Sequence, residues 1–222
     1  MITVHHLENS RSQRVLWLLE ELGVDYEVRR YERDKKTNLA PKALTKIHPL
    51  GKSPVVEDDG VIYAETGAII EHLVDAHGRG RLAPTAGSDD YRRYKYWMHA
   101  AEGSYMPPLL LALFVDRIEN APMPFFAKPV AKRLAKGIKD GYLDQTTNAL
   151  FGYLDDQLAS DEWLAGNEFS AADIIMSFPV EAALTRVGVA QKSRNLKQYA
   201  ERLHSRPAYQ RALEKGGPYA YA

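Results

Sequence analysis

The sequence predicts an α/β domain followed by an all-α domain in a chain of 222 residues. In the first part of the chain, short β-rich runs alternate with apolar residues at helical spacing. After a segment rich in glycine, proline and small residues, every further pattern is helical. Because 45% of the residues are hydrophobic, the chain can bury a sizeable core, in one large domain or two small ones.

The first elements predict a βαβ unit. Ile2–Leu7 is a short β-rich run, and Tyr26–Tyr31 has the length and the β-forming ends of a second strand. Between them lies a helical stripe that ends at Gly23 and consists of Val15, Leu16, Leu18, Leu19 and Leu22. Since βαβ units usually pair their strands in parallel, we expect a parallel pair here.

A hairpin and a helix complete the first domain. The polar stretch 32–50 is expected to be a loop, with one helical turn near 42–46. Two β-rich runs, 54–56 and 61–63, flank Asp59-Gly60, where glycine readily takes the positive φ of a hairpin turn. A final helical stripe follows at 69–74. The order βαβ, loop, ββα is typical of a thioredoxin-like domain.

The segment HGRGRLAPTAGS has the composition of a linker. We therefore predict a thioredoxin-like domain at 1–79, a linker at 80–88 and an all-helical domain at 89–222. The helical patterns of the second domain cover 91–115, 125–158, 170–187, 196–203 and 208–213.

Bulk composition narrows the class of partner. Lys+Arg and Asp+Glu both number 29, so no strong field indicates a nucleic acid or an anionic membrane. The sequence shows no secretory leader and no apolar run of membrane-spanning length, so we expect a cytoplasmic protein with a small-molecule partner. With no cysteine, any sulfur chemistry must use a thiol that the substrate brings.

Two features of the helical part predict local structure. Ser170 and Asp173 have the spacing of a capping box, which favours a structural role for Asp173 over a catalytic one. Pro107-Pro108 and Pro179 lie inside helical patterns, where we expect kinks because proline removes a backbone donor.

The segment 48–66 contains the residues that best predict a ligand pocket. A cis Ser53-Pro54 bond would turn the Ser53 backbone toward an extended ligand, whereas a trans edge-strand proline would have no such role. Glu65 and Thr66 open a helix, where they can bind the ammonium and carboxylate of an α-amino acid or simply cap the helix.

Ser10 follows the first strand and also has two interpretations. With Gln13 it has the spacing of a capping box, while its hydroxyl could instead donate to a ligand thiolate and lower the thiol pKa. Its neighbours Asn9, Arg11 and Ser12 could share or take this task.

The sequence offers little support for other kinds of catalytic or metal-binding site. His5 and His6 point to opposite faces of a strand, and no H-x-x-x-H pattern, G-x-S-x-G elbow or phosphate-binding glycine loop is present, so no metal is predicted. Tyr105 and Met106, beside Pro107, are our candidates for the wall of an apolar substrate site.

Four segments, in order and at family-like separations, carry a resemblance over almost the whole chain. They are SRSQRVLWLLEELG (10–23), HPLGKSPVVEDDG (48–60), YAETGAIIEHL (63–73) and WLAGNEFSAADIIMSFP (163–179). The chain thereby resembles the cytosolic glutathione transferases, and EGSYMPPL (102–109) is similar to the bacterial and fungal enzymes called Gtt1-like. The resemblance implies a homodimer with an active site near the subunit boundary.

The resemblance also assigns roles in binding the thiol peptide glutathione. Pro54 matches the family's cis-proline, and Ser53 the residue whose backbone pairs with the cysteinyl part of glutathione. Glu65 and Thr66 match the acid–hydroxyl pair for the γ-glutamyl end, and Lys52 lies where a polar side chain approaches glutathione's backbone or glycyl carboxylate.

Ser10 matches the serine of the serine-type classes, and Ser170 with Asp173 matches the structural capping box. Because the chain has no cysteine and no tyrosine in the loop after the first strand, only a mechanism through serine, asparagine or backbone remains.

The resemblance implies an enzyme that holds glutathione as thiolate near Ser10 and conjugates it to a small hydrophobic electrophile in detoxification. It implies no cofactor besides glutathione as co-substrate. Two alternatives stay open: a glutathione-dependent disulfide or peroxide reductase, and a non-catalytic scaffold or regulator on the same fold.

Overall fold

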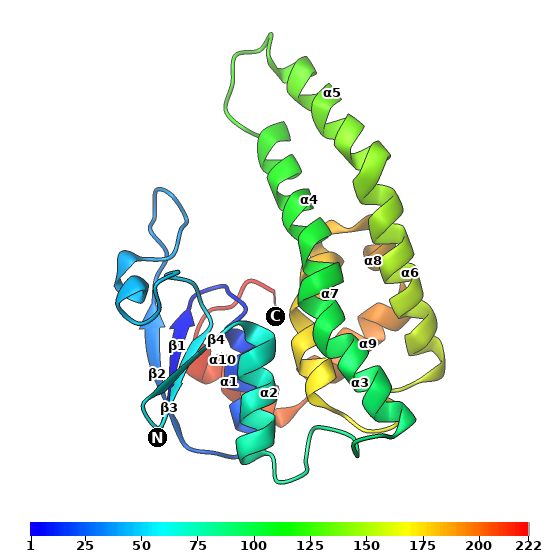
Figure 1. Cartoon of the computed structure of the whole chain (residues 1–222). Helices are drawn as coiled ribbons and strands as arrows, with labels where there is room; N and C mark the ends of the chain where they lie inside the picture. Colours follow the sequence, from blue (N-terminus) through cyan, green and yellow to red (C-terminus); the bar gives the residue numbers. More distant parts are fainter. Residues whose placement is uncertain (222) are drawn as a thin grey trace.

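The computed structural model describes residues 1–221, except for the side chains of Arg186 and Val189. The last residue of the predicted range 89–222 therefore lies outside the described residues. Figure 1 shows a small sheet on one side of the molecule and a set of long helices on the other, with α1 and α2 between them. The described C-terminal tail runs back from the helices toward the first domain.

The sheet has four strands in the order β2-β1-β3-β4. β1 pairs in parallel with β2 and antiparallel with β3, and β3 pairs antiparallel with β4. The strands are β1 (Ile2–Leu7), β2 (Tyr26–Tyr31), β3 (Val55–Asp58) and β4 (Val61–Ala64). Both the predicted parallel pair and the predicted hairpin are confirmed.

Two helices accompany the sheet. α1 (Gln13–Leu22) ends at Gly23, whose φ of 67° is the left-handed conformation that glycine adopts at little cost. α2 (Thr66–His77) follows β4, and a 3₁₀ turn, η1 (Lys42–Lys46), lies where the sequence predicts it. α1 packs against α2 and against α7 of the helical part, so its buried leucines belong to one continuous core.

The rest of the chain is helical, as predicted, and among its described residues only an isolated bridge between Trp163 and Gly166 has β character. Its helices are α3 (Asp89–Ala100), α4 (Met106–Glu119), α5 (Lys128–Ile138), α6 (Asp144–Ser160), α7 (Ala171–Arg186), α8 (Gly188–Lys192), α9 (Arg194–His204) and α10 (Pro207–Gly216). The short α8 was not predicted, because five residues carry too little pattern.

The two longest predicted helices, 91–115 and 125–158, correspond to stretches that are helical without interruption over 89–119 and 128–160, but each contains a π-helical segment that the sequence did not predict. These segments are η2 (Ala101–Tyr105) in the first stretch and η3 (Lys139–Leu143) in the second. In the first, Pro107 and Pro108 cannot donate to the carbonyls one turn earlier, so the regular pattern cannot pass through this point. Pro179 lies inside α7, as expected from the sequence.

The capping box at the start of α7 is confirmed. The Ser170 side chain accepts from the Ala172 N–H at 3.3 Å, and Asp173 Oδ2 accepts from the Ser170 N–H at 2.9 Å. Asp173 Oδ1 also accepts from the Tyr199 hydroxyl at 2.8 Å. Burial raises the pKa of Asp173, against the effect of these hydrogen bonds. With every contact directed into the core, Asp173 has a structural role.

α2 ends at His77 and α3 begins at Asp89, with no helix or strand in the residues between them. This interval contains the linker that the sequence predicts at 80–88. Among the described residues, no helix has the length and apolar character needed to cross a bilayer.

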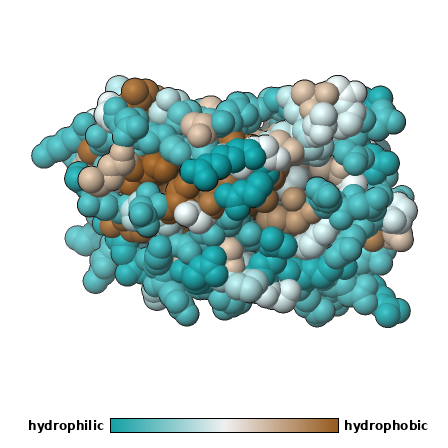
Figure 2. Space-filling view, turned by 90° about the horizontal axis from the view of Figure 1, so that it is seen from below, coloured by the Kyte–Doolittle hydropathy of each residue, from teal (hydrophilic) through white to brown (hydrophobic). Residues whose placement is uncertain are grey.

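Large hydrophobic side chains also reach the surface. Figure 2, seen from below, shows them gathered in the left and central part of a mostly hydrophilic face. Val61 and Ile62 of β4 are exposed. A second exposed set lies on α4, on α5 and in the turn between them, and consists of Leu110, Phe114, Ile118, Phe125, Phe126, Val130, Leu134 and Ile138.

Candidate functional site

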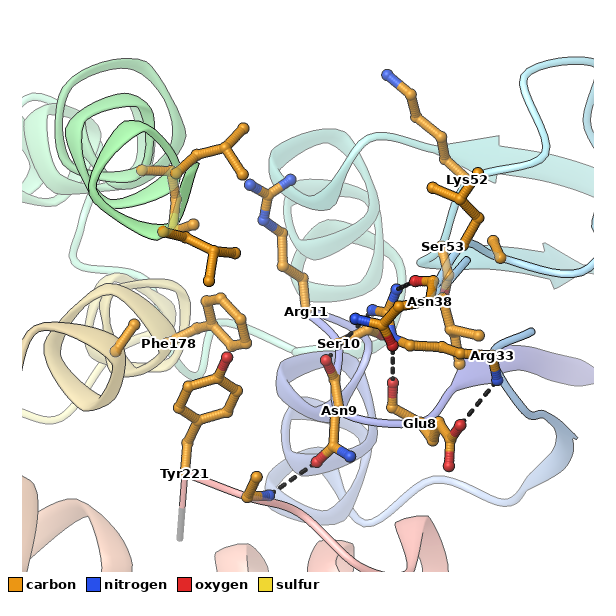
Figure 3. Close-up of a pocket in the computed structure, with 18 of the residues that line it drawn as sticks. Glu8, Asn9, Ser10, Arg11, Arg33, Asn38, Lys52, Ser53, Phe178 and Tyr221 are labelled. Atoms are coloured by element: carbon orange, nitrogen blue, oxygen red, sulfur yellow. Dashed lines mark hydrogen bonds between the residues drawn. The ribbon is translucent and has the colours of Figure 1, made fainter. Parts of the chain in front are cut away.

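A cavity of about 730 Å³ lies between the loops at one end of the sheet and the helices α4 and α7 (Figure 3). Its polar side includes Ser10, Lys52 and Ser53, three of the predicted site residues. Its opposite side is largely apolar and includes Met106, Leu110 and Phe114 of α4, Phe178 of α7 and Tyr221 of the C-terminal tail. One cavity therefore has a polar wall on the first domain and an apolar wall on the helices.

Ser10 lies at this cavity with only 6% of its surface exposed. Its predicted capping box with Gln13 is wrong, because α1 has Ser12 at its N-cap and the Ser10 side chain does not cap the helix. Instead, Ser10 Oγ accepts from the Ser12 N–H at 3.2 Å and lies 2.8 Å from Ser12 Oγ. Of its neighbours, Asn9 and Arg11 line the cavity, while Ser12 is fully buried.

Ser10 is the first member of a buried chain of polar groups. Ser12 Oγ lies 2.8 Å from His6 Nδ1, on the side away from Ser10. Burial lowers the pKa of His6 to about 4, with help from Arg30, while a hydrogen bond with the Gly216 carbonyl acts against it. His6 is therefore neutral near pH 7, and because Gly216 takes its one N–H, Nδ1 can accept from Ser12. Either hydroxyl can donate in the contact between Ser12 and Ser10, and Ser12 Oγ also lies 3.3 Å from the Leu7 carbonyl.

The Ser53-Pro54 peptide bond is cis, so the alternative of a trans edge-strand proline is wrong. The Ser53 side chain donates to the His5 carbonyl at 3.0 Å, which ties the start of β3 to β1. Lys52 is exposed at the rim of the cavity (Figure 3).

Glu65 and Thr66 do not line this cavity. Glu65 is exposed at the N-cap of α2 with a φ of 70°, a conformation that non-glycine residues adopt rarely and mainly at functional sites. Glu65 thus occupies the capping position that the sequence offers as an alternative, but its side chain makes no capping hydrogen bond within the described residues. Thr66 is buried, and its hydroxyl accepts from Arg14 at 3.4 Å.

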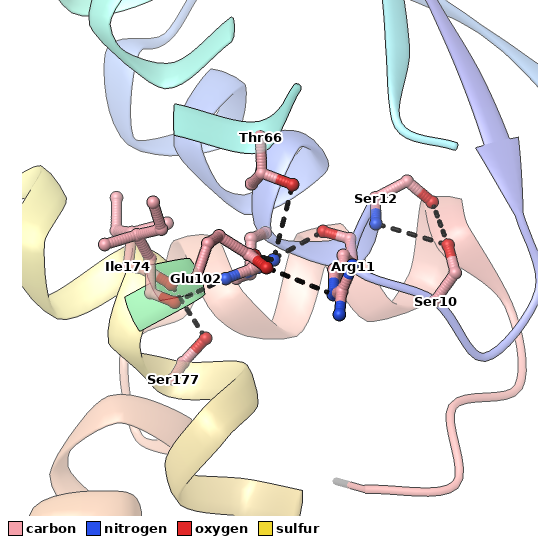
Figure 4. A network of polar contacts seen from close by, with 9 residues as sticks. Ser10, Arg11, Ser12, Thr66, Glu102, Ile174 and Ser177 are labelled. Carbon is pink, nitrogen blue, oxygen red and sulfur yellow. Dashed lines mark hydrogen bonds and ion pairs between the residues drawn. The ribbon is translucent and has the colours of Figure 1, made fainter. Parts of the chain in front are cut away.

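A network of charges connects Thr66 to the cavity (Figure 4). Arg14 is 1% exposed and donates to Glu102 of η2 at 2.5 Å. Glu102 also pairs with Arg11 at 3.4 Å, and Arg11 lines the cavity. Thr66 is thus connected through Arg14 and Glu102 to Arg11, which lines the cavity.

Arg14 also satisfies a backbone group that proline leaves without a partner. Its Nη1 donates to the Ile175 carbonyl at 2.6 Å. In a regular helix this carbonyl would accept from residue 179, but Pro179 has no N–H. The first and second domains therefore share one buried cation at the site.

The C-terminal tail covers another side of the cavity. The Ala220 N–H donates to Asn9 Oδ1 at 2.8 Å (Figure 3), and the Tyr219 hydroxyl donates to the buried Glu181 at 2.6 Å. The Tyr221 ring lies 5.2 Å from Phe178. These contacts bring the tail against the apolar wall.

Sequence analysis missed several of these residues. Arg14 was missed, although two features of the sequence pointed to it. It is a charged residue inside an apolar helix, and Pro179, inside another helix, leaves a carbonyl that needs a donor. Phe178 and Tyr221 carry no signal of their own. Of the two residues proposed for the apolar wall, Met106 is correct and Tyr105 is wrong, because Tyr105 is fully buried and its hydroxyl donates to the Leu150 carbonyl at 2.9 Å.

Known proteins match this chain over both parts. The model of the glutathione S-transferase N-terminal domain matches residues 1–75, and that of the C-terminal domain matches residues 135–207. Glutathione S-transferase 3 of Schizosaccharomyces pombe is 42% identical, over 97% of this chain and 88% of that protein. Glutathione S-transferase 1 of Saccharomyces cerevisiae is 32% identical, over 84% of this chain and 82% of that protein.

Solved structures agree. The crystal structure of a glutathione S-transferase from Actinobacillus pleuropneumoniae has a TM-score of 0.83 and 33% identity, and the match covers 100% of this chain and 95% of that one. The two family models, the identity to the yeast enzymes and the fold together give one conclusion: the chain belongs to the glutathione S-transferase family.

Proposed function

We propose that this enzyme binds glutathione along the polar wall of the cavity and conjugates its sulfur to a small hydrophobic electrophile. The observation that carries the proposal is that one cavity joins Ser10, Lys52 and Ser53 to the apolar side chains of α4 and α7. Its volume of about 730 Å³ lies in the range of small-molecule sites, roughly 300 to 1,000 Å³.

The glutathione contacts that we propose rest on the family resemblance and on the surroundings of each residue. The Ser53 backbone pairs with the cysteinyl part of the peptide, and exposed Lys52 attracts the glycyl carboxylate. Glu65 accepts from the γ-glutamyl ammonium, while Thr66, held by Arg14, binds the carboxylate at the N-terminus of α2. Support for these last two roles comes from the family resemblance and from the Arg14 network.

Ser10 stabilises the sulfur as thiolate. The Ser10 hydroxyl lies 2.8 Å from Ser12 Oγ, which in turn lies 2.8 Å from His6 Nδ1. On glutathione binding, the Ser10 hydroxyl donates to the sulfur, which favours the thiolate over the thiol, and the thiol proton passes to solvent. The thiolate then attacks the electrophilic carbon, forms the C–S bond and displaces the leaving group, which departs with the electrons of the broken bond.

The Ser10→Ala variant tests this role. Loss of a hydrogen bond to a charged group, about 1.5 to 3 kcal/mol, should lower kcat roughly ten- to hundredfold with little change in glutathione affinity. It should also raise the pKa of the bound thiol, followed through the ultraviolet absorbance of the thiolate. Ser160→Ala, on the exposed end of α6, is the matched control. An unchanged kcat for Ser10→Ala would remove Ser10 from the mechanism.

The choice of second substrate is tested separately. We expect turnover with 1-chloro-2,4-dinitrobenzene, because the apolar wall accepts an aromatic ring. Activity with a small mixed disulfide or a peroxide alone would contradict conjugation and support the reductase. Failure to bind glutathione in calorimetry would support a non-catalytic scaffold.

We also propose a cytoplasmic homodimer that acts in detoxification. The family resemblance supports all three statements. Exposed Val61 and Ile62 on β4, together with the exposed apolar residues of α5, support the dimer because such side chains are commonly buried in subunit interfaces. A monomeric mass by light scattering at micromolar concentration would contradict it.

A further inference from the structure

Three side chains with metal-ligating atoms meet at the far end of β3 and α2. They are Asp58, the last residue of β3, and His72 and His77 of α2. Their ligand atoms all lie within 4.8 Å of one another. None of the three lines the cavity of the proposed active site, so the cluster lies outside that site.

The two imidazoles point the same nitrogen at the same oxygen. His72 Nε2 lies 2.9 Å and His77 Nε2 lies 2.8 Å from Asp58 Oδ2. Tyr63 of β4 stacks on His72 with ring centroids 3.7 Å apart, which holds that ring in place. Both histidines remain about one-quarter exposed, whereas the Asp58 carboxylate is 8% exposed.

The Asp58 carboxylate and the two imidazoles each offer one ligand atom to a cation at this point. His77 is also the last residue of α2, where the helix dipole presents its negative end. Two imidazole nitrogens and one carboxylate oxygen form a ligand set that suits Zn²⁺.

We propose that Asp58, His72 and His77 bind one Zn²⁺ ion, with water as the fourth ligand. Zinc bonds of about 2.0 to 2.1 Å in a tetrahedral site set neighbouring ligand atoms about 3.3 Å apart. The present N–O separations of 2.8 and 2.9 Å are a few tenths of an ångström below this value, and all three ligand atoms lie within 4.8 Å of one another. Each imidazole proton moves from Nε2 to Nδ1 through the solvent that reaches both rings.

The position of the cluster gives the ion a structural role. β3 begins directly after Ser53 and Pro54, and α2 begins at Thr66, so both elements carry proposed glutathione-binding residues at their near ends. The cluster joins the far ends of these same two elements. A bound Zn²⁺ therefore links the strand and the helix that position the peptide, without taking part in the reaction.

The test uses the full chain without a histidine tag, treated with a chelator and then titrated with ZnCl₂ by calorimetry. We expect one Zn²⁺ per chain and a higher melting temperature with zinc. His72→Gln and His77→Gln should each weaken zinc binding by at least about tenfold. Loss of a residue that only orients a metal ligand typically weakens binding by about this factor or more, and loss of the ligand itself should weaken it no less. The matched control is His99→Gln, which removes an exposed histidine of α3 and should bind zinc as the wild type does.

The ligands can also be identified directly. With Cu²⁺ as a probe, electron paramagnetic resonance should show hyperfine coupling to two nitrogens in the wild type and to one in His72→Gln. No bound zinc and no shift in melting temperature for the wild type would overturn the proposal. So would equal zinc affinity in the wild type and the two glutamine variants, once glutathione binding shows that the variants are folded.

Discussion

Replacing Arg14 by methionine should destabilise the enzyme through one identifiable backbone group. Arg14 donates to Ile175 O at 2.6 Å and to Glu102 at 2.5 Å, with 1% of its surface exposed. Removing one partner from a buried ion pair costs about 3 to 5 kcal/mol, the lower end being expected here because Glu102 is partly exposed and keeps Arg11. The unpaired Ile175 carbonyl accounts for about 1 to 3 kcal/mol of this loss.

A second substitution separates the contribution of the Ile175 carbonyl from those of the other Arg14 contacts. Pro179→Ala provides the N–H that the Ile175 carbonyl lacks in α7, so it should offset the Arg14→Met loss by about 1 to 3 kcal/mol in a double-mutant cycle measured by urea unfolding. Pro207→Ala is the matched control, because Pro207 is the first residue of α10 and leaves no helix carbonyl without a donor. The pair Arg14→Met and Pro207→Ala should be additive within about 0.5 kcal/mol.

The same cycle has a second readout. Arg14→Met also removes the contact with the Thr66 hydroxyl, so the KM for glutathione should rise, and Pro179→Ala should not restore it. If Arg14→Met and Pro179→Ala change the free energy of unfolding additively, the stabilising contact between Arg14 and the Ile175 carbonyl is refuted. A KM that recovers along with stability would refute a direct role for Arg14 at Thr66.

Three further predictions concern other parts of the site. The pKa of His6 is about 4 in the folded chain and about 6.5 in the unfolded chain, so the free energy of unfolding should fall by up to about 3 kcal/mol as the pH drops from 6.5 to 4. The His6→Gln variant should lose this pH dependence in urea unfolding. A pH profile that is the same in the variant and the wild type would contradict the prediction. Because Tyr221 lies at the apolar wall, Tyr221→Ala should raise the KM for an aromatic electrophile several-fold and leave the KM for glutathione unchanged. Equal changes in the two KM values would contradict this prediction. Glu181→Leu leaves the Tyr219 and Tyr209 hydroxyls without their acceptor, so the free energy of unfolding should fall by about 3 kcal/mol. Because Tyr219 belongs to the tail, limited proteolysis should also cut the tail sooner, and an unchanged cleavage rate would exclude this anchor.

The elements of the first domain could be predicted almost residue by residue, because each is short and bounded by a clear signal. Gly23 ends α1, and Asp59-Gly60 turns β3 into β4. The π-helical segments inside the two long helices could not be predicted, since hydrophobic spacing continues through such a segment with only a small change of phase. Periodicity identifies a helix but does not reveal where its hydrogen bonds change partner.

Of the five site residues predicted from local motifs, Glu65 and Thr66 do not line the cavity, and contacts between distant segments could not be predicted at all. Ser10, Lys52 and Ser53 belong to local motifs, and all three lie at one cavity. Arg14 and Tyr221 act through contacts with residues far away in the sequence. The cluster of Asp58, His72 and His77 was missed for the same reason, because a strand end and a helix face approach only in the fold.

The π-helical segment in the first long helix and the charge network at the site have a common origin. Pro107 and Pro108 prevent regular hydrogen bonding in the preceding turn, and that turn is η2, which carries Glu102. In η2, Glu102 faces both Arg11 and Arg14. Pro179 acts similarly in α7, since it leaves a carbonyl that Arg14 satisfies. Prolines in two separate helices therefore provide Arg14 with two partners, the Glu102 carboxylate and the Ile175 carbonyl. Through these contacts, the irregular backbone of the helical domain helps to join the two domains at the site.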